Sequence, residues 1–359
     1  MWRALIVLGL LAGCAPRAAL MSAPSGLDLP TRSVFVTTQR DIDPETRALT
    51  AARSPQSRHM QIDITLPPNR PEGEVAFPFR KPDPETDMLV SDVTPFGTQG
   101  ALITGIKRAL SQSDEKRVQL YIHGYNNTFA DGVLRTVQMA EDFDFNGVSA
   151  HYSWPSAGNA LAYAFDRESI MASRAGLQDL IVALSGLTTK EFTVVAHSVG
   201  SDLLMEVLRD LAISGRRDVL DRLDGVVLIS PDIDLDVFKA QATRIGKLPD
   251  PFIVIASPND RALTVSARLT GQVSRVGSLG DSDELGAFDL LFLDVSGLSS
   301  GGDRLRHFTA ASSPEAIRLI RQLSKTADAL GRDAALRPGL IPGSVIRARQ
   351  TTRIILGQP

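Results

Sequence analysis

The chain has 359 residues, of which 43% are hydrophobic, and this suits one large domain with modest appendages. Its formal net charge is −3 and it has no basic run, which argues against a nucleic-acid partner. A single cysteine excludes a disulfide within the chain, and no Cys/His cluster has metal-ligand spacing, so we expect neither a metal nor another cofactor.

Residues 1–13 have the pattern of a targeting segment. Arg3 precedes an apolar run over residues 4–12, which is too short for a membrane span and typical of a signal-peptide core. The run ends in Leu11-Ala12-Gly13-Cys14, which resembles the lipobox of bacterial lipoproteins. That resemblance implies a lipid on Cys14 that anchors the chain to a membrane, and Ala15 favours the outer membrane, facing the periplasm of a Gram-negative bacterium. An ordinary signal peptide with an incidental cysteine is the alternative.

The remaining elements follow in chain order. Residues 14–31 are rich in Ala, Pro and Ser and predict a flexible tether. Apolar patterns predict strands at 32–40 and 59–66, a mostly irregular stretch over 67–100, and a helix at 98–110. From residue 118, strands at 118–122, 147–154, 192–196, 226–229, 252–256 and 288–295 alternate with helices at 128–143, 159–186, 199–211, 235–243, 260–269 and 313–328.

Continuous apolar strands that alternate with amphipathic helices predict an α/β fold, with a mostly parallel central sheet flanked by helices on both faces. We expect this domain to cover residues 32–330. Residues 331–359 contain Pro338, Pro342 and scattered arginines, and they predict an extended C-terminal tail without an assigned role.

The clearest chemical signal is Ala196-His197-Ser198-Val199-Gly200. It follows a β-branched strand and precedes an amphipathic helix, which is the context of a nucleophile elbow. The turn must be strained to expose the serine Oγ, so the residues two before and two after must be small, as Ala196 and Gly200 are. Alanine replaces the first glycine of the strict G-x-S-x-G pattern. The alternative is a serine that only caps the helix.

A serine nucleophile needs a general base, which is normally histidine. Of the five histidines, His59 lies in the irregular N-terminal region, His123 and His197 occupy other motif positions, and His151 is within a strand before the elbow. Only His307 follows the elbow, in a loop after the last predicted parallel strand, where an α/β-hydrolase places its histidine. We therefore predict His307 as the base.

The acid that orients the histidine has two candidates. Asp260 follows the strand at 252–256 through a Ser-Pro-Asn turn, where the acid of this fold usually lies. Asp232 occupies the corresponding place one strand earlier. We favour Asp260, although any aspartate at a strand-to-helix junction can also be a simple N-cap.

The segment His123-Gly124-Tyr125-Asn126-Asn127 follows the strand at 118–122 and resembles the His-Gly loop of α/β hydrolases. The resemblance implies an oxyanion hole built from the backbone amides of Tyr125 and Val199. Asn126 is a candidate for the acyl pocket. Trp154 is either a wall of that pocket or part of the core.

Four motifs together resemble a bacterial α/β-hydrolase family of uncharacterised function: His-Gly-Tyr-Asn-Asn, Ser-Trp-Pro-Ser, Ala-His-Ser-x-Gly and Ser-Pro-Asp-Ile-Asp. The likeness covers residues 32–328 and implies an α/β-hydrolase fold and hydrolase chemistry, but no substrate. We expect a serine hydrolase that cleaves carboxylic esters through an acyl-enzyme, with a small-molecule or lipid ester as substrate. The alternatives are a lipase or acyltransferase on envelope lipids, and a non-catalytic lipoprotein that uses the fold as a binding scaffold.

Overall fold

The computed structural model describes residues 18–78, 81–187, 191–269, 271, 274–299, 303, 305–330, 343–348 and 351–356. The predicted signal peptide and Cys14 lie outside these residues. The strands are β1 (Thr31–Ile42), β2 (Leu49–Thr65), β3 (Val90–Phe96), β4 (Arg117–Ile122), β5 (Val148–Ser153), β6 (Glu191–His197), β7 (Gly225–Ile229), β8 (Phe252–Ala256), β9 (Leu291–Asp294), β10 (Gly343–Ala348) and β11 (Thr351–Leu356). The helices are α2 (Gln99–Gln112), α3 (Phe129–Asp142), α4 (Tyr163–Ala172), α5 (Arg174–Ser185), α6 (Val199–Ile213), α7 (Arg217–Leu220), α8 (Leu235–Ile245), α9 (Arg261–Leu269), α10 (Thr309–Ser312) and α11 (Pro314–Leu330).

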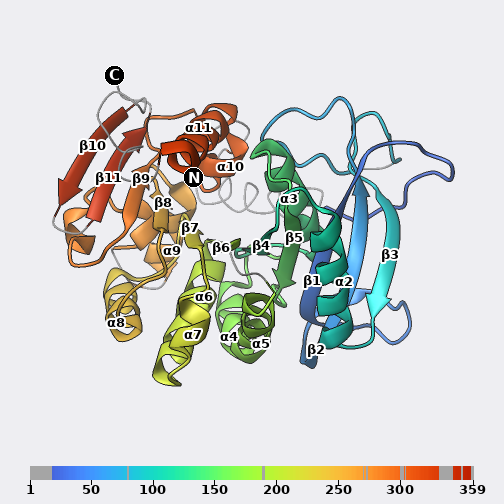
Figure 1. Cartoon of the computed structure of the whole chain (residues 1–359), viewed down its shortest axis with the longest axis horizontal. Helices are drawn as coiled ribbons and strands as arrows, with labels where there is room; N and C mark the ends of the chain where they lie inside the picture. The colour runs from blue at the N-terminus through green and yellow to red at the C-terminus, as the bar shows by residue number, and fades with distance from the viewer. Residues whose placement is uncertain are drawn as a thin grey trace, which may run out of the picture.

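All strands join one eleven-stranded sheet in the order β10-β11-β9-β8-β7-β6-β4-β5-β1-β2-β3, which spans the molecule from left to right in Figure 1. The pairings from β1 through β5, β4, β6, β7, β8 and β9 to β11 are parallel. Antiparallel strands β2 and β3 close one edge and β10 closes the other. The predicted mostly parallel α/β sheet is confirmed.

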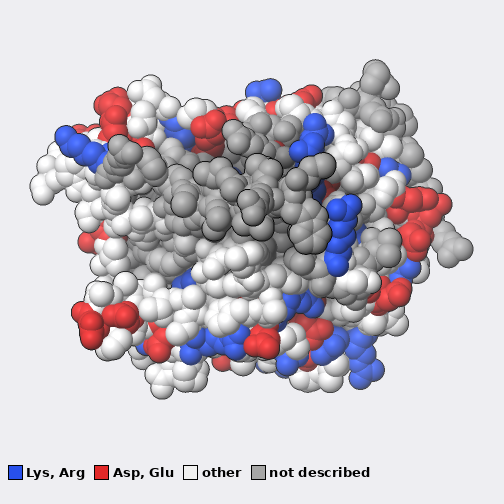
Figure 2. Space-filling model, turned by 180° about the vertical axis from the view of Figure 1, so that it is seen from behind, with Lys and Arg blue, Asp and Glu red and all other residues white. Residues whose placement is uncertain are grey.

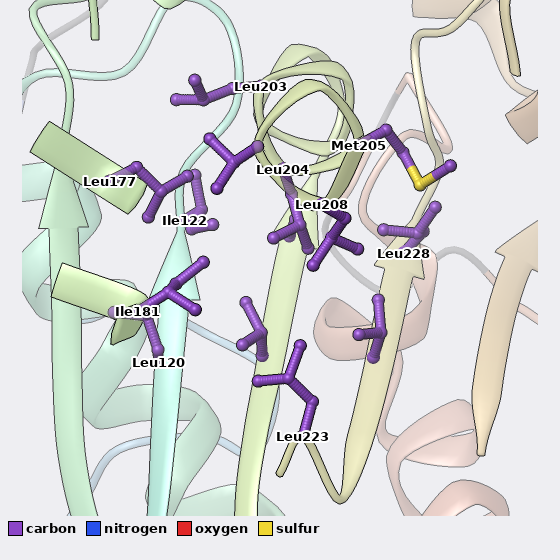
Figure 3. Packing of buried hydrophobic residues seen from close by; sticks show 14 of the residues in the cluster. Leu120, Ile122, Leu177, Ile181, Leu203, Leu204, Met205, Leu208, Leu223 and Leu228 are labelled. Atoms are coloured by element: carbon purple, nitrogen blue, oxygen red, sulfur yellow. The ribbon is translucent and has the colours of Figure 1, made fainter. Parts of the chain in front are cut away.

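The two faces of the sheet are covered by different helices, because side chains alternate along each strand. In β4, Leu120 and Ile122 pack in a core cluster with α2, α5, α6 and α8. Tyr121, between them, belongs to a second cluster with α3, α10 and α11. Figure 3 shows Leu204 and Leu208 of α6 lying over the strands of the first face. Helix α6 is thus fixed against the middle of the sheet, directly after β6.

The predicted helix at 159–186 is interrupted, since Ser173 separates α4 from α5. The Tyr152 hydroxyl donates a hydrogen bond to the Ser173 carbonyl at 2.8 Å. A Cβ on Gly176 would lie 2.8 Å from the same hydroxyl oxygen and 2.7 Å from the Gln39 side chain. Helix and strand therefore meet through a buried polar contact at this point, which the helical periodicity of the sequence does not reveal.

The described parts of both terminal segments pack against the domain. Within the segment expected to be a flexible tether, Ala18 is buried in a core cluster beside α3. The Ala23 amide donates to the Val90 carbonyl at 2.7 Å, and the Val90 amide donates to the Met21 carbonyl at 2.9 Å. An edge strand such as β3 has backbone N–H and C=O groups that no further strand binds, and residues 21–23 form hydrogen bonds with those of Val90.

At the other end, part of the expected extended tail pairs with the sheet. Strand β11 lies parallel to β9, and β10 returns antiparallel to β11. Ile354 and Leu356 are buried, and the guanidinium of Arg353 contacts the Asp294 carboxylate at 2.6 Å. Arg353, which makes this strand hard to recognise in the sequence, lies between the buried residues Thr352 and Ile354.

Among the described residues, no helix combines the length and apolar composition that crossing a membrane requires. Basic and acidic side chains alternate along the lower edge of the rear face (Figure 2). This mixing of signs fits the small net charge of the chain.

Candidate active site

The parallel strands direct their carboxyl ends to one edge of the sheet, and the candidate residues follow those ends. Ser198 is the single residue between β6 and α6. Its backbone has φ 54° and ψ −125°, a conformation that non-glycine residues rarely adopt. The Ser198 amide donates to the Ile229 carbonyl of β7 at 3.0 Å. The strained turn expected of a nucleophile elbow is therefore present.

Two glycines allow the loop after β4 to press against this turn. A Cβ on Gly200 would lie 2.3 Å from the His123 carbonyl oxygen, and a Cβ on Gly124 would lie 2.8 Å from the Ser198 Cβ. Both distances are far below normal carbon contacts, so a side chain at either position would separate the loop from the serine. Glycine is required at both places for the close approach.

His307 and Asp260 meet above the strand ends. The His307 Nδ1 lies 2.8 Å from Asp260 Oδ2, and the Asp260 side chain is fully buried while that of His307 is 17% exposed. The His307 ring packs against the ring of His197, with centroids 4.7 Å apart. Since His197 directly precedes Ser198, His307 lies beside the elbow, with its Nδ1 facing Asp260.

The histidines differ in the direction of their pKa shifts. Burial lowers the pKa of His307, but the hydrogen bond and charge of Asp260, helped by Asp232 and Asp303, raise it above its usual value overall. Burial lowers the pKa of each of the other four histidines. The pKa falls to about 3 for His151. It lies well below the usual value for His123 and His197, and it is also lowered for His59. Only His307 combines a carboxylate partner with partial exposure.

Asp232, the alternative acid, has other partners. Its carboxylate accepts hydrogen bonds from the Tyr163 hydroxyl at 3.0 Å and from Ser266 at 2.8 Å, and it pairs with Arg275 Nε at 3.3 Å. The Asp232 amide donates to the Ser198 carbonyl at 3.2 Å. Burial and the charge of Asp232 raise the pKa of Tyr163 to about 12, so the phenol stays protonated. Asp232 is thus next to the elbow but bound to a separate polar network.

The loop that carries Tyr125 and Asn126 is held by several contacts. The Tyr125 hydroxyl donates to the Ala160 carbonyl, and its ring meets the Tyr163 ring edge-on with centroids 5.3 Å apart. Asn126 has φ 60°, and its amide donates to Asp166 Oδ2 at 3.1 Å. Val199 begins α6 and is buried. Gly124 and Ser198 approach each other closely, and Tyr125 and Val199 are the residues that directly follow them. The two backbone amides of the expected oxyanion hole therefore belong to neighbouring segments.

Trp154 does not line an accessible pocket wall, in contrast to one of the two roles considered for it. It is fully buried, and its ring stacks on His123 with centroids 4.7 Å apart and an interplanar angle of 15°. Its Nε1 donates to the His123 carbonyl at 2.7 Å, and the His123 Nε2 lies 3.0 Å from the Trp154 carbonyl. A buried indole N–H needs an acceptor, and the His123 carbonyl provides it. Trp154 therefore packs against the loop at His123 and holds it in place.

Sequence reasoning missed Asp166 and Arg40, which join the loops after β4 and β5. The buried Asp166 carboxylate accepts from the Ser156 hydroxyl at 2.6 Å and from the Ala157 amide at 2.7 Å, in addition to Asn126. The buried Arg40 donates to the carbonyls of Asn127 at 3.0 Å and Ser156 at 2.8 Å. Burial lowers the pKa of Arg40 to about 10. No local motif signals either residue.

Among the described residues, no three His, Cys, Asp or Glu side chains gather as metal ligands would. Cys14, the predicted lipidation site, lies outside the described residues.

A strained serine elbow at the carboxyl edge of a mostly parallel sheet, with a histidine–aspartate pair from later strands, defines an α/β-hydrolase fold. The chain belongs to a family of alpha/beta hydrolases of unknown function (DUF900), whose model matches residues 98–323. No curated protein matches the chain.

The chain is similar to several solved structures at low sequence identity. A dienelactone hydrolase from Anabaena variabilis is 12% identical, with 74% of this chain and 89% of that chain covered and a TM-score of 0.38. Esterase B from Lactobacillus rhamnosis is 17% identical, with 61% and 77% covered and a TM-score of 0.36. A fungal esterase from Rhizomucor miehei is 12% identical, with 91% and 88% covered and a TM-score of 0.36. At this level of similarity, their substrates say nothing about the substrate of this chain.

Proposed function

We propose that this chain is a serine hydrolase that cleaves carboxylic esters through an acyl-enzyme, with Ser198 as nucleophile, His307 as general base and Asp260 as the acid that orients it. The observation that carries the proposal is the strained Ser198 turn beside a histidine whose Nδ1 lies 2.8 Å from a fully buried carboxylate. A serine that only capped a helix would not require the φ of 54°.

In the proposed reaction, the neutral His307 takes the Ser198 proton while Oγ attacks the ester carbonyl carbon. The amides of Tyr125 and Val199 stabilise the oxyanion that forms. The C–O bond then breaks, and His307 gives its proton to the leaving alcohol. Next, His307 deprotonates a water molecule, which attacks the acyl-serine and releases the acid. Asp260 stays ionised and stabilises the imidazolium in both halves.

The location proposed for this enzyme is the outer membrane, with a lipid on Cys14 and the catalytic domain in the periplasm. The lipobox-like Leu11-Ala12-Gly13-Cys14 supports this, as does its position after a signal-peptide-like apolar run. Intact mass of the chain produced in a Gram-negative host tests it, because acylation adds the mass of the lipid and removal of residues 1–13 subtracts theirs.

The hydrolase proposal is tested on the full chain with p-nitrophenyl esters of increasing acyl length and with a fluorophosphonate probe. We expect turnover and probe labelling in the wild type, and a loss of kcat of about 10⁴-fold or more with no labelling in Ser198→Ala. Ser201→Ala is the matched control, because Ser201 lies on the same helix and its hydroxyl donates to the Ala196 carbonyl at 3.1 Å. Folded protein with neither turnover nor labelling would overturn the proposal in favour of a binding scaffold.

A further inference from the structure

We propose that the sheet edge that carries Ser198 faces the surface of a lipid bilayer, and that the esters it hydrolyses are acyl lipids drawn from that surface. The occupant of this docking face is the bilayer in which the lipid on Cys14 would be embedded. The substrate class rests on the proposed hydrolase function, whereas the orientation of the edge does not depend on it.

The first observation is a group of exposed apolar side chains around the candidate site. Leu161 is 94% exposed, Leu305 is 54% exposed and Val265 is 53% exposed. We call these three residues the apolar rim. Apolar side chains with this exposure near a candidate site are typical of interaction surfaces and of segments that enter a membrane interface.

Hydrogen bonds connect the segments that carry the rim residues to the site. Leu305 is two residues before His307, and its carbonyl accepts from the Arg261 amide at 3.0 Å, at the start of α9. Val265 lies one turn further along α9, beside Ser266, whose hydroxyl lies 2.9 Å from that of Tyr163. The rim residues of α9 and of the last loop are therefore on the His307 side of the site.

Leu161 lies next to the loop proposed to hold the oxyanion. Its neighbour Ala160 accepts a hydrogen bond from the Tyr125 hydroxyl. Leu161 is also two residues before Tyr163, whose hydroxyl contacts Asp232 and Ser266. The apolar rim thus comes from three segments near the site, the one before α4, α9 and the loop before His307, rather than from a single helix.

The charge on α9 suits a phospholipid surface. Arg261 and Arg268 are both exposed, and they lie four residues before and three residues after Val265, which places all three on one face of the helix. Apolar side chains flanked by arginines enter an interface whose phosphate groups bind the guanidinium ions.

The second, independent observation concerns where the membrane anchor would begin. Ala18 is buried, and the Thr128 hydroxyl lies 3.4 Å from its carbonyl oxygen. Thr128 caps α3 and is four residues after Gly124, at the same carboxyl edge as Ser198. From Ala23, which pairs with Val90, the chain therefore runs back to this edge as it approaches Cys14.

This geometry restricts the reach of the anchor. Cys14 is four residues before Ala18, and four residues span about 14 Å when fully extended. A free tether over residues 15–31 would allow the domain to turn in any direction. Because Ala18 is held beside Thr128, a lipid on Cys14 keeps the active-site edge near the membrane instead.

The experiment uses the full acylated chain in vesicles of phosphatidylethanolamine and phosphatidylglycerol that contain a spin-labelled lipid. Acylation consumes the only native thiol, so Leu161→Cys, Val265→Cys and Leu305→Cys can each be labelled with a fluorophore at one position. Ile213→Cys is the matched control: Ile213 is 52% exposed and ends the fifteen-residue helix α6, about 22 Å along its axis from the elbow.

We expect the spin-labelled lipid to quench fluorophores at 161, 265 and 305 and to leave the fluorophore at 213 unchanged. Equal quenching at all four positions, no quenching at the rim, or an unacylated Cys14 would overturn the proposed orientation. Quenching of the rim alone without turnover of any ester would support the orientation and overturn the hydrolase function instead.

The substrate class is tested by a double variant, Leu161→Ser with Val265→Ser, against two esters. Hydrolysis of a long-chain lipid ester embedded in the vesicles should fall about tenfold or more, because two apolar side chains no longer enter the interface. Hydrolysis of soluble p-nitrophenyl butyrate should stay within about twofold. An equal fall with both esters, or no fall with the embedded one, would contradict the assignment to membrane lipids. Ile213→Ser is the control for both measurements.

Discussion

Asp232 and Asp260 occupy equivalent places after neighbouring parallel strands, and both are buried, yet their surroundings differ. Asp260 follows β8 and contacts His307. Asp232 follows β7 and contacts Arg275, Ser266 and the Tyr163 hydroxyl. The comparison shows that two carboxylates at equivalent places in the fold can have different partners. Asp260 lies against the histidine proposed as the base, whereas Asp232 pairs with a buried arginine in a separate polar network.

The largest expected difference between the two carboxylates is in rate. Asp260→Asn removes the charge that stabilises the imidazolium of His307 and leaves an amide that can favour the wrong tautomer. We expect kcat to fall by about 10³- to 10⁴-fold, by analogy with triad aspartates. Steady-state kinetics with a p-nitrophenyl ester measure it, with unchanged circular dichroism as evidence of folding. If Asp232→Asn showed this loss and Asp260→Asn did not, the assignment of the acid would be reversed.

The second difference is in stability. Asp232→Asn breaks the ion pair of Asp232 with the nearly fully buried Arg275, and breaking a buried ion pair costs about 3 kcal/mol in the free energy of unfolding. Its kcat should fall no more than about tenfold, since His307 keeps Asp260. Urea unfolding followed by fluorescence gives the free energy. Asp218→Asn, which breaks the exposed ion pair with Arg216, is the control and should leave the unfolding midpoint unchanged. A midpoint equal to wild type in Asp232→Asn would contradict a structural role.

The fold was predictable because its signals are local. Continuous apolar strands and amphipathic helices of the parallel part are visible in the order of residues, and so is the small-residue pattern around Ser198. The break of the helix at Ser173 depends on Tyr152, and the strand at 351–356 depends on β9. These features need a partner distant in the sequence, which no window of neighbouring residues contains.

The same distinction applies to the candidate site. Ser198 and His307 were predicted from motif and chain order, and the structure brings Asp260, rather than Asp232, to the histidine. Asp166 could not be found this way, because its role comes from the backbone amides of two loops that meet only in the folded chain. For Trp154, a side chain at a strand end can point to either side of a loop, and only packing against His123 decides which.

The smallest expected effect is on the pH dependence, and it involves both carboxylates. The low-pH limb of kcat/KM reports protonation of His307 in the free enzyme. Burial lowers the pKa of His307, while the hydrogen bond and charge of Asp260, and to a lesser degree the charge of Asp232, raise it. Removing either carboxylate therefore lowers the pKa, so His307 stays neutral, and competent as a base, to lower pH.

Asp260→Asn should consequently move the low-pH limb of its residual activity to lower pH, and Asp232→Asn should move it in the same direction by less. Rates at constant ionic strength across the limb measure both shifts, with Asp218→Asn as the control that leaves it in place. A limb that moved to higher pH in either variant would mean that the group being titrated is not a histidine held by these two carboxylates. A larger shift in Asp232→Asn than in Asp260→Asn would show that Asp260 is not the carboxylate with the strongest effect on the pKa of His307, contrary to the 2.8 Å contact between them.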